Sequence, residues 1–132
     1  PKKKLGNPIN DTLNLLKKSR EFAIKNGVPA HRIALDPGIG FFRQTKLPWW
    51  KWDIEVLKNL TKLTALDLPL LVGVSRKSFI GFTLDLPADQ RVEGTAATVA
   101  VGITRGADII RAHDVKEMAR VAKMTDAIVR KG

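Results

Sequence analysis

The chain has 132 residues, of which 44% are hydrophobic and 27% charged, a composition typical of one globular domain and not of a disordered segment. The absence of cysteine excludes disulfides and thiolate metal sites, and no apolar run reaches the roughly 18 residues of a membrane span. The net charge of +10 is spread along the chain, so we expect a solvated basic surface with neither nucleic acid nor a membrane as partner. The lack of cysteine also suits a reducing cytoplasm, which is the location we expect.

The chain is expected to begin with a helix and a short strand. Asp11 can cap a helix that runs to about Asn26, and Gly27 follows as a residue type that commonly ends helices. Residues 32–36, RIALD, predict a strand, and the turn sequence DPGIG comes directly after it. The buried stripe of the helix would comprise Leu15, Leu16, Phe22 and Ala23.

The middle of the chain predicts a long loop, a second helix and a buried strand. The loop spans residues 41–52 and is rich in tryptophan, and Asp53 can cap a helix that runs to about Ala65. After Pro69, residues 70–74 form an apolar run rich in branched side chains. Such a run is typical of a parallel strand that is buried on both faces.

The last third of the chain predicts a helix, a strand and a final helix. A loop reaches about residue 90, and residues 91–105 predict a helix whose small side chains would let it lie close to a sheet. Residues 108–112, DIIRA, predict a third strand. Asp114 would cap the last helix, and Glu117 would complete a capping box. The buried stripe of this helix would comprise Met118, Val121, Ala122, Thr125, Ile128 and Val129.

The alternation of helices and strands predicts an α/β fold with parallel strands. Three strands are few for a parallel sheet, and the first helix has no strand before it. We therefore interpret residues 1–132 as a single partial domain, one portion of a larger (β/α) protein without its N-terminal strands. A complete three-stranded domain is the alternative. An incomplete barrel would leave a free strand edge and an uncovered inner face, so we expect self-association or pairing with the missing half.

Each predicted strand ends in residues that can bind a ligand, where parallel α/β folds place their sites. Asp36 ends the first strand, and its carboxylate suits the guanidine-like edge of an aminopyrimidinone ring. The alternative is that Asp36 makes a local turn with Gly38. The second strand runs into S-R-K-S at residues 75–78, which brings two cations and two hydroxyl groups.

Three side chains at these strand ends could form an anion pocket. Arg111 and His113 are two residues apart and therefore face the same side of the third strand. Together with Lys77 they offer a planar fork, a mobile point charge and a proton donor to phosphate oxygens. His113 could instead be structural, and Arg76 could be a surface residue paired with a neighbour.

Three tryptophans, Trp49, Trp50 and Trp52, lie beside basic residues in the long loop. They could stack on single-stranded bases, form a lid over an aromatic ligand or anchor an interface. We favour a fourth interpretation, the local packing of the loop onto the rest of the fold.

The motifs DPGIGF, LLVGVSRKSFIG and RAHDV occur in this order at residues 36–41, 70–81 and 111–115, with an R-x-x-G-T segment at Arg91. In this combination the chain resembles dihydropteroate synthase over nearly its whole length. The resemblance implies a (β/α)8 TIM barrel, of which this chain would be the C-terminal portion, the last three β/α units plus a preceding helix.

The resemblance also implies a reaction: p-aminobenzoate condenses with 6-hydroxymethyl-7,8-dihydropterin diphosphate in folate synthesis, with release of pyrophosphate. Asp36 would hold the pterin edge, while Lys77 would contact the pterin ring and border the p-aminobenzoate site. Arg111 and His113 would hold the diphosphate, and these two residues with Lys77 are the catalytic candidates. The remaining substrate contacts implied are Phe41 in the p-aminobenzoate pocket, Ser78 near its carboxylate and Gly73 beside the pterin.

Two departures from the family pattern qualify this interpretation. The tryptophan-rich loop replaces a shorter stretch after DPGIGF, and the N-terminal strands that carry the family's Mg²⁺ ligand are not in this chain. We therefore expect Mg²⁺ only in the full-length enzyme, no metal ligand in this chain, and no turnover by this chain alone. A homodimer is the other expected assembly. The alternative functions are a methyltetrahydrofolate-dependent methyltransferase, a basic nucleic-acid-binding module that uses the tryptophans, and a non-catalytic pterin-binding fragment.

Overall fold

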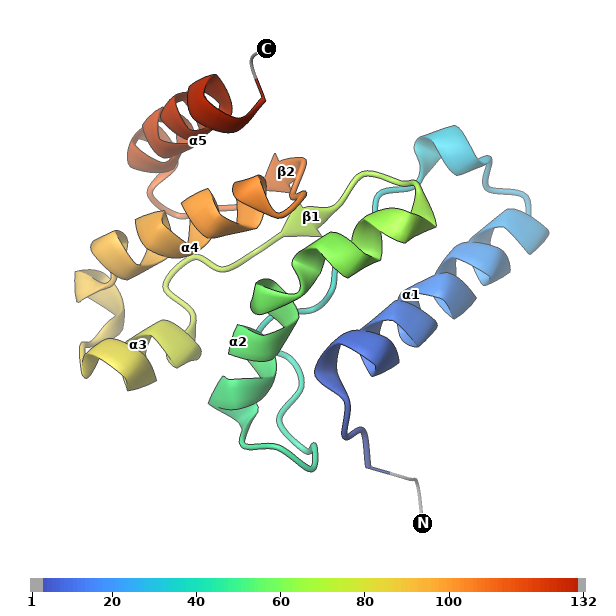
Figure 1. The fold of residues 1–132 in the computed structure, drawn as a ribbon, viewed down its shortest axis with the longest axis horizontal. Coiled ribbons are helices and arrows are strands. Elements are labelled where there is room, and N and C mark those ends of the chain that lie inside the picture. Colours follow the sequence, from blue (N-terminus) through green and yellow to red (C-terminus); the bar gives the residue numbers. More distant parts are fainter. Residues whose placement is uncertain (1–3, 131–132) are drawn as a thin grey trace.

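The computed structural model describes residues 4–130. Short parallel strands lie among longer helices (Figure 1), but the strict alternation that the sequence predicts is not present in these residues, because two α-helices precede each strand. The helices and strands are α1 (Pro8–Lys25), α2 (Trp49–Lys58), β1 (Leu71–Val72), α3 (Ser78–Leu84), α4 (Val92–Thr104), β2 (Ile109–Ile110) and α5 (Val115–Val129). Single 3₁₀ turns or short 3₁₀ helices cover Ala30–Arg32, Leu60–Leu66 and Ala88–Gln90.

The sheet has β1 at its centre. β1 pairs in parallel with β2, with Leu71 opposite Ile109. On the other side of β1, Leu35 forms an isolated parallel bridge with Leu70. The predicted strand 32–36 is thus reduced to one bridge, because a 3₁₀ turn takes up its beginning and a side-chain turn takes up its end.

The two faces of β1 differ in burial. Leu70, Val72 and Val74 are fully buried beneath the helices. Leu71 and Gly73 point to the other face and are partly exposed, and the neighbouring Ile109 of β2 is 41% exposed. The sequence predicts a strand that is buried on both faces, but in the structure only one face of it is covered. In Figure 1, α1 lies at one side of the sheet and α5 at the other.

The first helix begins earlier than the sequence predicts. Its N-cap is Asn7, whose side chain accepts a hydrogen bond from the N–H of Asn10, and Pro8 is the first helical residue. Asp11 lies inside the first turn, where its carboxylate accepts hydrogen bonds from two preceding N–H groups. Gly27 follows the helix with φ of +96°, as predicted.

The predicted stripe of α1 is only partly correct. Leu16 is buried, together with Ile9 and Thr12. Leu15 and Phe22 are 40% and 70% exposed, because the stripe that faces α2 and the 3₁₀ helix Leu60–Leu66 passes through the positions of Thr12 and Leu16.

The second helix starts four residues before the predicted cap, directly after Pro48. Asp53 is therefore an interior residue of α2, and the prediction that it caps the helix is wrong. The helix ends at Lys58, and the rest of the predicted span continues as the 3₁₀ helix Leu60–Leu66.

The predicted loop after S-R-K-S contains a seven-residue helix, α3. No side chain caps its N-terminus, so the sequence carries no capping signal for it. The next helix, α4, agrees with prediction to within one residue at each end. Its small residues allow a close approach to α3 as well: a Cβ at Gly94 would lie 2.3 Å from Cγ2 of Ile80. Gly106 ends α4 with φ of +111°.

Asp114 occupies the N-cap position of α5, but its side chain makes no capping hydrogen bond. The predicted capping box is therefore wrong, since this carboxylate pairs with Arg76 instead. Met118 and Thr125 of the predicted stripe are buried, whereas Ile128 and Val129 are 71% and 42% exposed. Within residues 4–130, no helix has both the length and the apolar character needed to cross a membrane.

Candidate functional site

A cavity of about 430 Å³ lies at the carboxyl ends of β1 and β2. It contains every sequence-predicted site residue except Asp36 and Ser78. Ser75, which the sequence places in S-R-K-S without a substrate contact, and Ala112, which it does not single out, also line the cavity. The lining residues are Phe41, Gly73, Ser75, Lys77, Arg111, Ala112 and His113.

The cavity combines cationic side chains with one aromatic ring. The Nζ atom of Lys77 lies 4.8 Å from the ring centroid of Phe41, which is 74% exposed. Arg111 and His113 reach the cavity from β2, and the N–H of Arg111 donates to the carbonyl of Val72, so the parallel ladder continues to the cavity edge. Lysine, arginine and histidine around one space can bind an anionic group.

Gly73 forms an open part of the wall. A Cβ built at this position would meet no heavy atom of the described residues within 4 Å. The space in front of the strand is therefore free for a flat ligand, which a larger side chain would obstruct.

The turn that presents Lys77 is strained and firmly held. Arg76 has φ of +54°, in the left-handed region that non-glycine residues seldom adopt. Its N–H donates to Oγ1 of the fully buried Thr95 at 3.0 Å, and its carbonyl accepts from Nη1 of Arg91 at 2.9 Å. Two residues of α4 and its N-terminal flank thus hold the backbone that leads into Lys77.

The side chain of Arg76 joins this turn to the start of α5. Its guanidinium donates two hydrogen bonds to Asp114, at 2.9 and 3.2 Å. The hydrogen bond from Arg76 lowers the pKa of Asp114 below its ordinary value, and the same pairing raises the pKa of Arg76. The surface-pairing interpretation of Arg76 is therefore confirmed.

Ser75 and His113 are joined across the two strands. The backbone N–H of His113 donates to Oγ of Ser75 at 2.9 Å, and the same Oγ lies 2.7 Å from Nδ1 of the His113 ring. Ser75 is buried, with an exposed fraction of 6%. The sequence placed Ser75 at the strand end, but the pairing of the two residues depends on strand register.

The DPGIG loop turns in the way that its composition predicts. Oδ1 of Asp36 accepts a hydrogen bond from the N–H of Gly38 at 2.8 Å, so the predicted local turn is present. Asp36 is exposed and does not line the cavity. Gly40 has φ of +90°, and a Cβ there would lie 3.0 Å from Cδ of Lys77, so glycine permits the close approach of loop and lysine.

Asp53 supports this loop from beneath. The residue is 1% exposed, and its Oδ1 accepts a hydrogen bond from the N–H of Gly40 at 3.0 Å. Burial raises the pKa of Asp53; the Gly40 hydrogen bond and the nearby charges of Arg43 and Lys77 act in the opposite direction. This support was missed because the contact joins residues thirteen positions apart through an irregular loop.

The three tryptophans lie in the first residues of α2, not in a loop as predicted, and they pack against the rest of the fold. Trp52 is fully buried, with its ring centroid 5.4 Å from that of Phe42. Trp50 stacks on Phe82 of α3 at 4.8 Å, and Trp49 meets the same ring edge-on at 5.8 Å. These contacts agree with the favoured interpretation, local packing.

Arg43 connects this aromatic cluster to the S-R-K-S turn. Its guanidinium lies 4.5 Å from the ring centroid of Trp49, and its Nη2 donates to Oγ of Ser78 at 2.7 Å. The Ser78 hydroxyl therefore engages the long loop in this structure, away from the residues that line the cavity.

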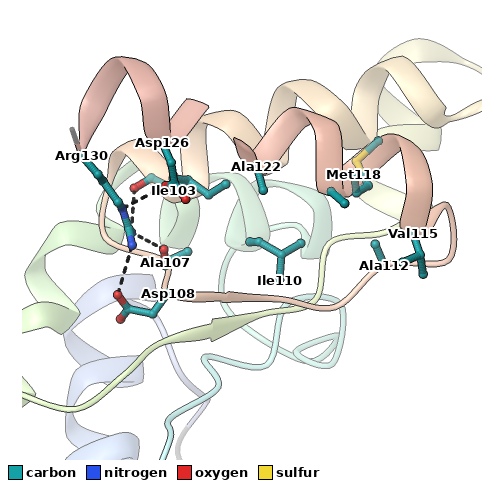
Figure 2. Close-up of a pocket in the computed structure, with 11 residues that line it drawn as sticks. Ile103, Ala107, Asp108, Ile110, Ala112, Val115, Met118, Ala122, Asp126 and Arg130 are labelled. Carbon is teal, nitrogen blue, oxygen red and sulfur yellow. Dashed lines mark hydrogen bonds and ion pairs between the residues drawn. The ribbon is translucent and has the colours of Figure 1, made fainter. Parts of the chain in front are cut away.

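A second cavity, of about 240 Å³, lies between β2 and α5 (Figure 2). Ile110, Met118 and Ala122 give it an apolar wall, and Arg130 closes one end through Asp108 and two backbone carbonyls. Its charged groups are thus engaged with one another, which distinguishes it from the cationic cavity at the strand ends.

Within residues 4–130, no group of three or more histidine, aspartate and glutamate side chains is placed to hold a metal ion.

Comparison with known proteins assigns the family. A model described as "Pterin binding enzyme" matches residues 3–113. The chain is 43% identical to dihydropteroate synthase of Bacillus subtilis over 132 residues, which is 100% of this chain and 45% of the relative. It is 45% identical to dihydropteroate synthase of Clostridium beijerinckii over 126 residues, 95% of this chain and 45% of the relative. The chain thus spans slightly less than half the length of these relatives.

Solved structures give the same result. A dihydropteroate synthase from Clostridium difficile, determined in the presence of pteroic acid, superposes with a TM-score of 0.87 at 44% identity, covering 94% of this chain and 45% of that one. The Yersinia pestis enzyme gives 0.84 at 34% identity, covering 94% and 56%. The predicted fold class, a C-terminal portion of a (β/α)8 barrel, is therefore confirmed. The chain belongs to the pterin-binding enzyme family, and the resemblance to dihydropteroate synthase is confirmed.

Proposed function

We propose that the chain supplies one wall of a dihydropteroate synthase site. In this reaction the C–O bond to diphosphate would break first and pyrophosphate would leave. The amine of p-aminobenzoate would then form a C–N bond to the pterin methylene carbon and lose one proton to water. The observation that carries the proposal is the convergence of Lys77, Arg111 and His113 on one cavity at the strand ends. Cationic groups at this place would stabilise the negative charge that develops on the leaving diphosphate.

We propose roles for the cavity residues in this reaction. Arg111 would bind diphosphate oxygens through its planar guanidinium, and His113 would donate a further hydrogen bond. Lys77 would contact the pterin ring, and Phe41 would form an apolar side of the p-aminobenzoate pocket. Gly73 would leave room for the flat pterin, which agrees with the open space in front of it.

Two of the proposed substrate contacts involve side chains that already have a partner. Asp36 now holds the DPGIG turn, and Ser78 accepts a hydrogen bond from Arg43. For Asp36 to bind the pterin edge, its second carboxylate oxygen would serve, since the Gly38 hydrogen bond uses Oδ1. For Ser78 to reach the p-aminobenzoate carboxylate, Arg43 would have to move or take part in binding.

The exposed inner face of the sheet supports a proposal about assembly. Ile109 and Leu71 lie on a face that a complete barrel would cover, and we propose that the N-terminal half of such a barrel covers it. Residues 1–132 would then be one partial domain, inactive alone. A homodimer, a Mg²⁺ requirement of the full-length enzyme and a cytoplasmic location remain predictions.

Ligand binding to the chain itself tests the site. Isothermal titration with pyrophosphate and with a dihydropterin diphosphate should show weak binding of both, and Arg111→Ala should weaken it about tenfold or more, since a hydrogen bond to a charged group contributes on the order of 1.5–3 kcal/mol. Lys116→Ala, a change of an exposed cation on α5, is the matched control and should bind like the parent chain. Equal affinity in the Arg111→Ala variant would reject the proposed site.

A further inference from the structure

The pairing of Ser75 with His113 carries an inference about how the histidine is oriented. Oγ of Ser75 already accepts one hydrogen bond, from the backbone N–H of His113 at 2.9 Å. That bond leaves the hydroxyl hydrogen and one lone pair of Oγ unused, and Nδ1 of the same residue lies 2.7 Å away, so the contact itself fits either direction. Our inference takes the hydroxyl hydrogen to point at Nδ1, the direction that leaves the other ring nitrogen as a donor to the cavity. In this arrangement the serine is both acceptor and donor, and Nδ1 is the acceptor.

A neutral imidazole with an accepting Nδ1 carries its hydrogen on Nε2. His113 lines the cavity that contains Lys77 and Arg111, so the choice of tautomer decides whether the ring can offer an N–H donor beyond its contact with Ser75. A donor suits an anionic ligand, whereas a lone pair on Nε2 would repel one.

The scaffold around Ser75 is built to hold this contact. Ser75 is 6% exposed and lies three residues after the end of β1. The next residue, Arg76, is fixed by the hydrogen bond of its N–H to Thr95 and by two hydrogen bonds from its side chain to Asp114. Two neighbouring residues after β1 thus bind two neighbouring residues after β2: Ser75 contacts His113, and Arg76 contacts Asp114. Such a double connection leaves the hydroxyl little freedom to turn elsewhere.

We propose that Ser75 is a positioning residue that fixes the neutral His113 ring with its hydrogen on Nε2, as a donor to an anionic group in the cavity. The functional part of this inference rests on the proposed function, because the anion would be the diphosphate. The tautomer itself does not depend on any ligand.

Nitrogen NMR tests the orientation directly. The sequence has only two histidines, so long-range proton–nitrogen correlation spectra of the labelled chain at about pH 9, where imidazole is neutral, contain two ring systems. We expect His113 to show the Nε2–H pattern in the parent chain and a mixture of tautomers in Ser75→Ala. His31 serves as the internal reference in every spectrum.

Two further variants distinguish loss of the Ser75 hydroxyl from an unspecific effect of replacing a serine. Ser75→Thr keeps a hydroxyl and should restore the Nε2–H pattern, and Ser19→Ala removes an exposed serine of α1 and should change nothing. A parent spectrum with hydrogen on Nδ1, or an unchanged His113 pattern in Ser75→Ala, would overturn the proposal.

Pyrophosphate titration tests the consequence. Ser75→Ala should bind pyrophosphate about 3- to 10-fold more weakly, the range expected for one hydrogen bond that is no longer pre-oriented, and Ser75→Thr should recover most of the loss. If the parent chain binds no pyrophosphate, the proposed function fails while the NMR result still decides the tautomer. If the tautomer changes and the affinity does not, the positioning role is rejected.

Discussion

Replacing Asp53 tests whether a buried carboxylate supports the loop beside the site. Asp53→Ala would leave the N–H of Gly40 without the acceptor that now lies 3.0 Å away, in a place where Asp53 is 1% exposed. An unsatisfied buried donor costs about 1–3 kcal/mol, so the free energy of unfolding should fall by that amount. Asp53→Asn keeps an oxygen that can accept the hydrogen bond and should lose much less.

The pKa of Asp53 also predicts how the free energy of unfolding changes with pH. Burial raises the pKa of Asp53 above 3.8, so the folded chain holds its proton more tightly than the unfolded chain does. The stability that this proton contributes is fully present below the unfolded pKa and is lost as the pH rises through the folded pKa. The free energy of unfolding of Asp53→Asn relative to the parent chain should therefore rise with pH across this window.

Urea unfolding measured by tryptophan fluorescence at several pH values, with the parent and both variants side by side, provides the measurement. The difference between parent and Asp53→Asn cancels the titration of all other groups, including Asp114, whose pKa is shifted in the opposite direction. The reasoning is refuted if Asp53→Ala is as stable as the parent, or if Asp53→Asn loses as much stability as Asp53→Ala.

Three further predictions concern the loops around the site. Trp52→Ala should lower the free energy of unfolding by about 3–5 kcal/mol, because the ring is fully buried. Trp52→Phe should lose less, since the Trp52 Nε1 has no hydrogen-bond partner among the described residues; equal losses in urea titrations would contradict this. Gly40→Ala should cost about 1–2 kcal/mol at φ of +90° and weaken pyrophosphate binding by displacing Lys77, so an unchanged affinity in calorimetry would argue against that displacement. Because the pKa of Asp114 is lowered in the folded chain, the stability that this carboxylate contributes should be lost as the pH falls, and Asp114→Asn should not show that loss. Unfolding curves of both proteins below about pH 5 measure this, and an equal loss in both would refute it.

The parallel α/β pattern could be predicted because each strand and helix carries its own periodic signal. The helix at 91–105 was found to within one residue at each end, and residues 70–74 contain the shorter strand β1, Leu71–Val72. The cavity residues could be predicted for a related reason: polar side chains that follow parallel strands gather at one end of a sheet.

The predicted caps failed for a common physical reason. Asp11, Asp53 and Asp114 were each expected to cap the helix that they precede, but none of their carboxylates does so. Asp53 accepts from a distant loop, Asp114 pairs with an arginine 38 positions away, and Asp11 binds backbone groups in front of its own helix. Each carboxylate thus binds a partner other than the free N–H groups at the start of its helix, and for Asp53 and Asp114 that partner is distant in the sequence.

Reconstitution tests the central claim most directly. The chain should be mixed or co-expressed with the N-terminal part of the Bacillus subtilis relative, and the formation of dihydropteroate from dihydropterin diphosphate and p-aminobenzoate measured with Mg²⁺ present. We predict no turnover by either part alone, turnover by the pair, and its loss with Arg111→Ala. A pair that forms a stable complex yet makes no dihydropteroate would contradict the account.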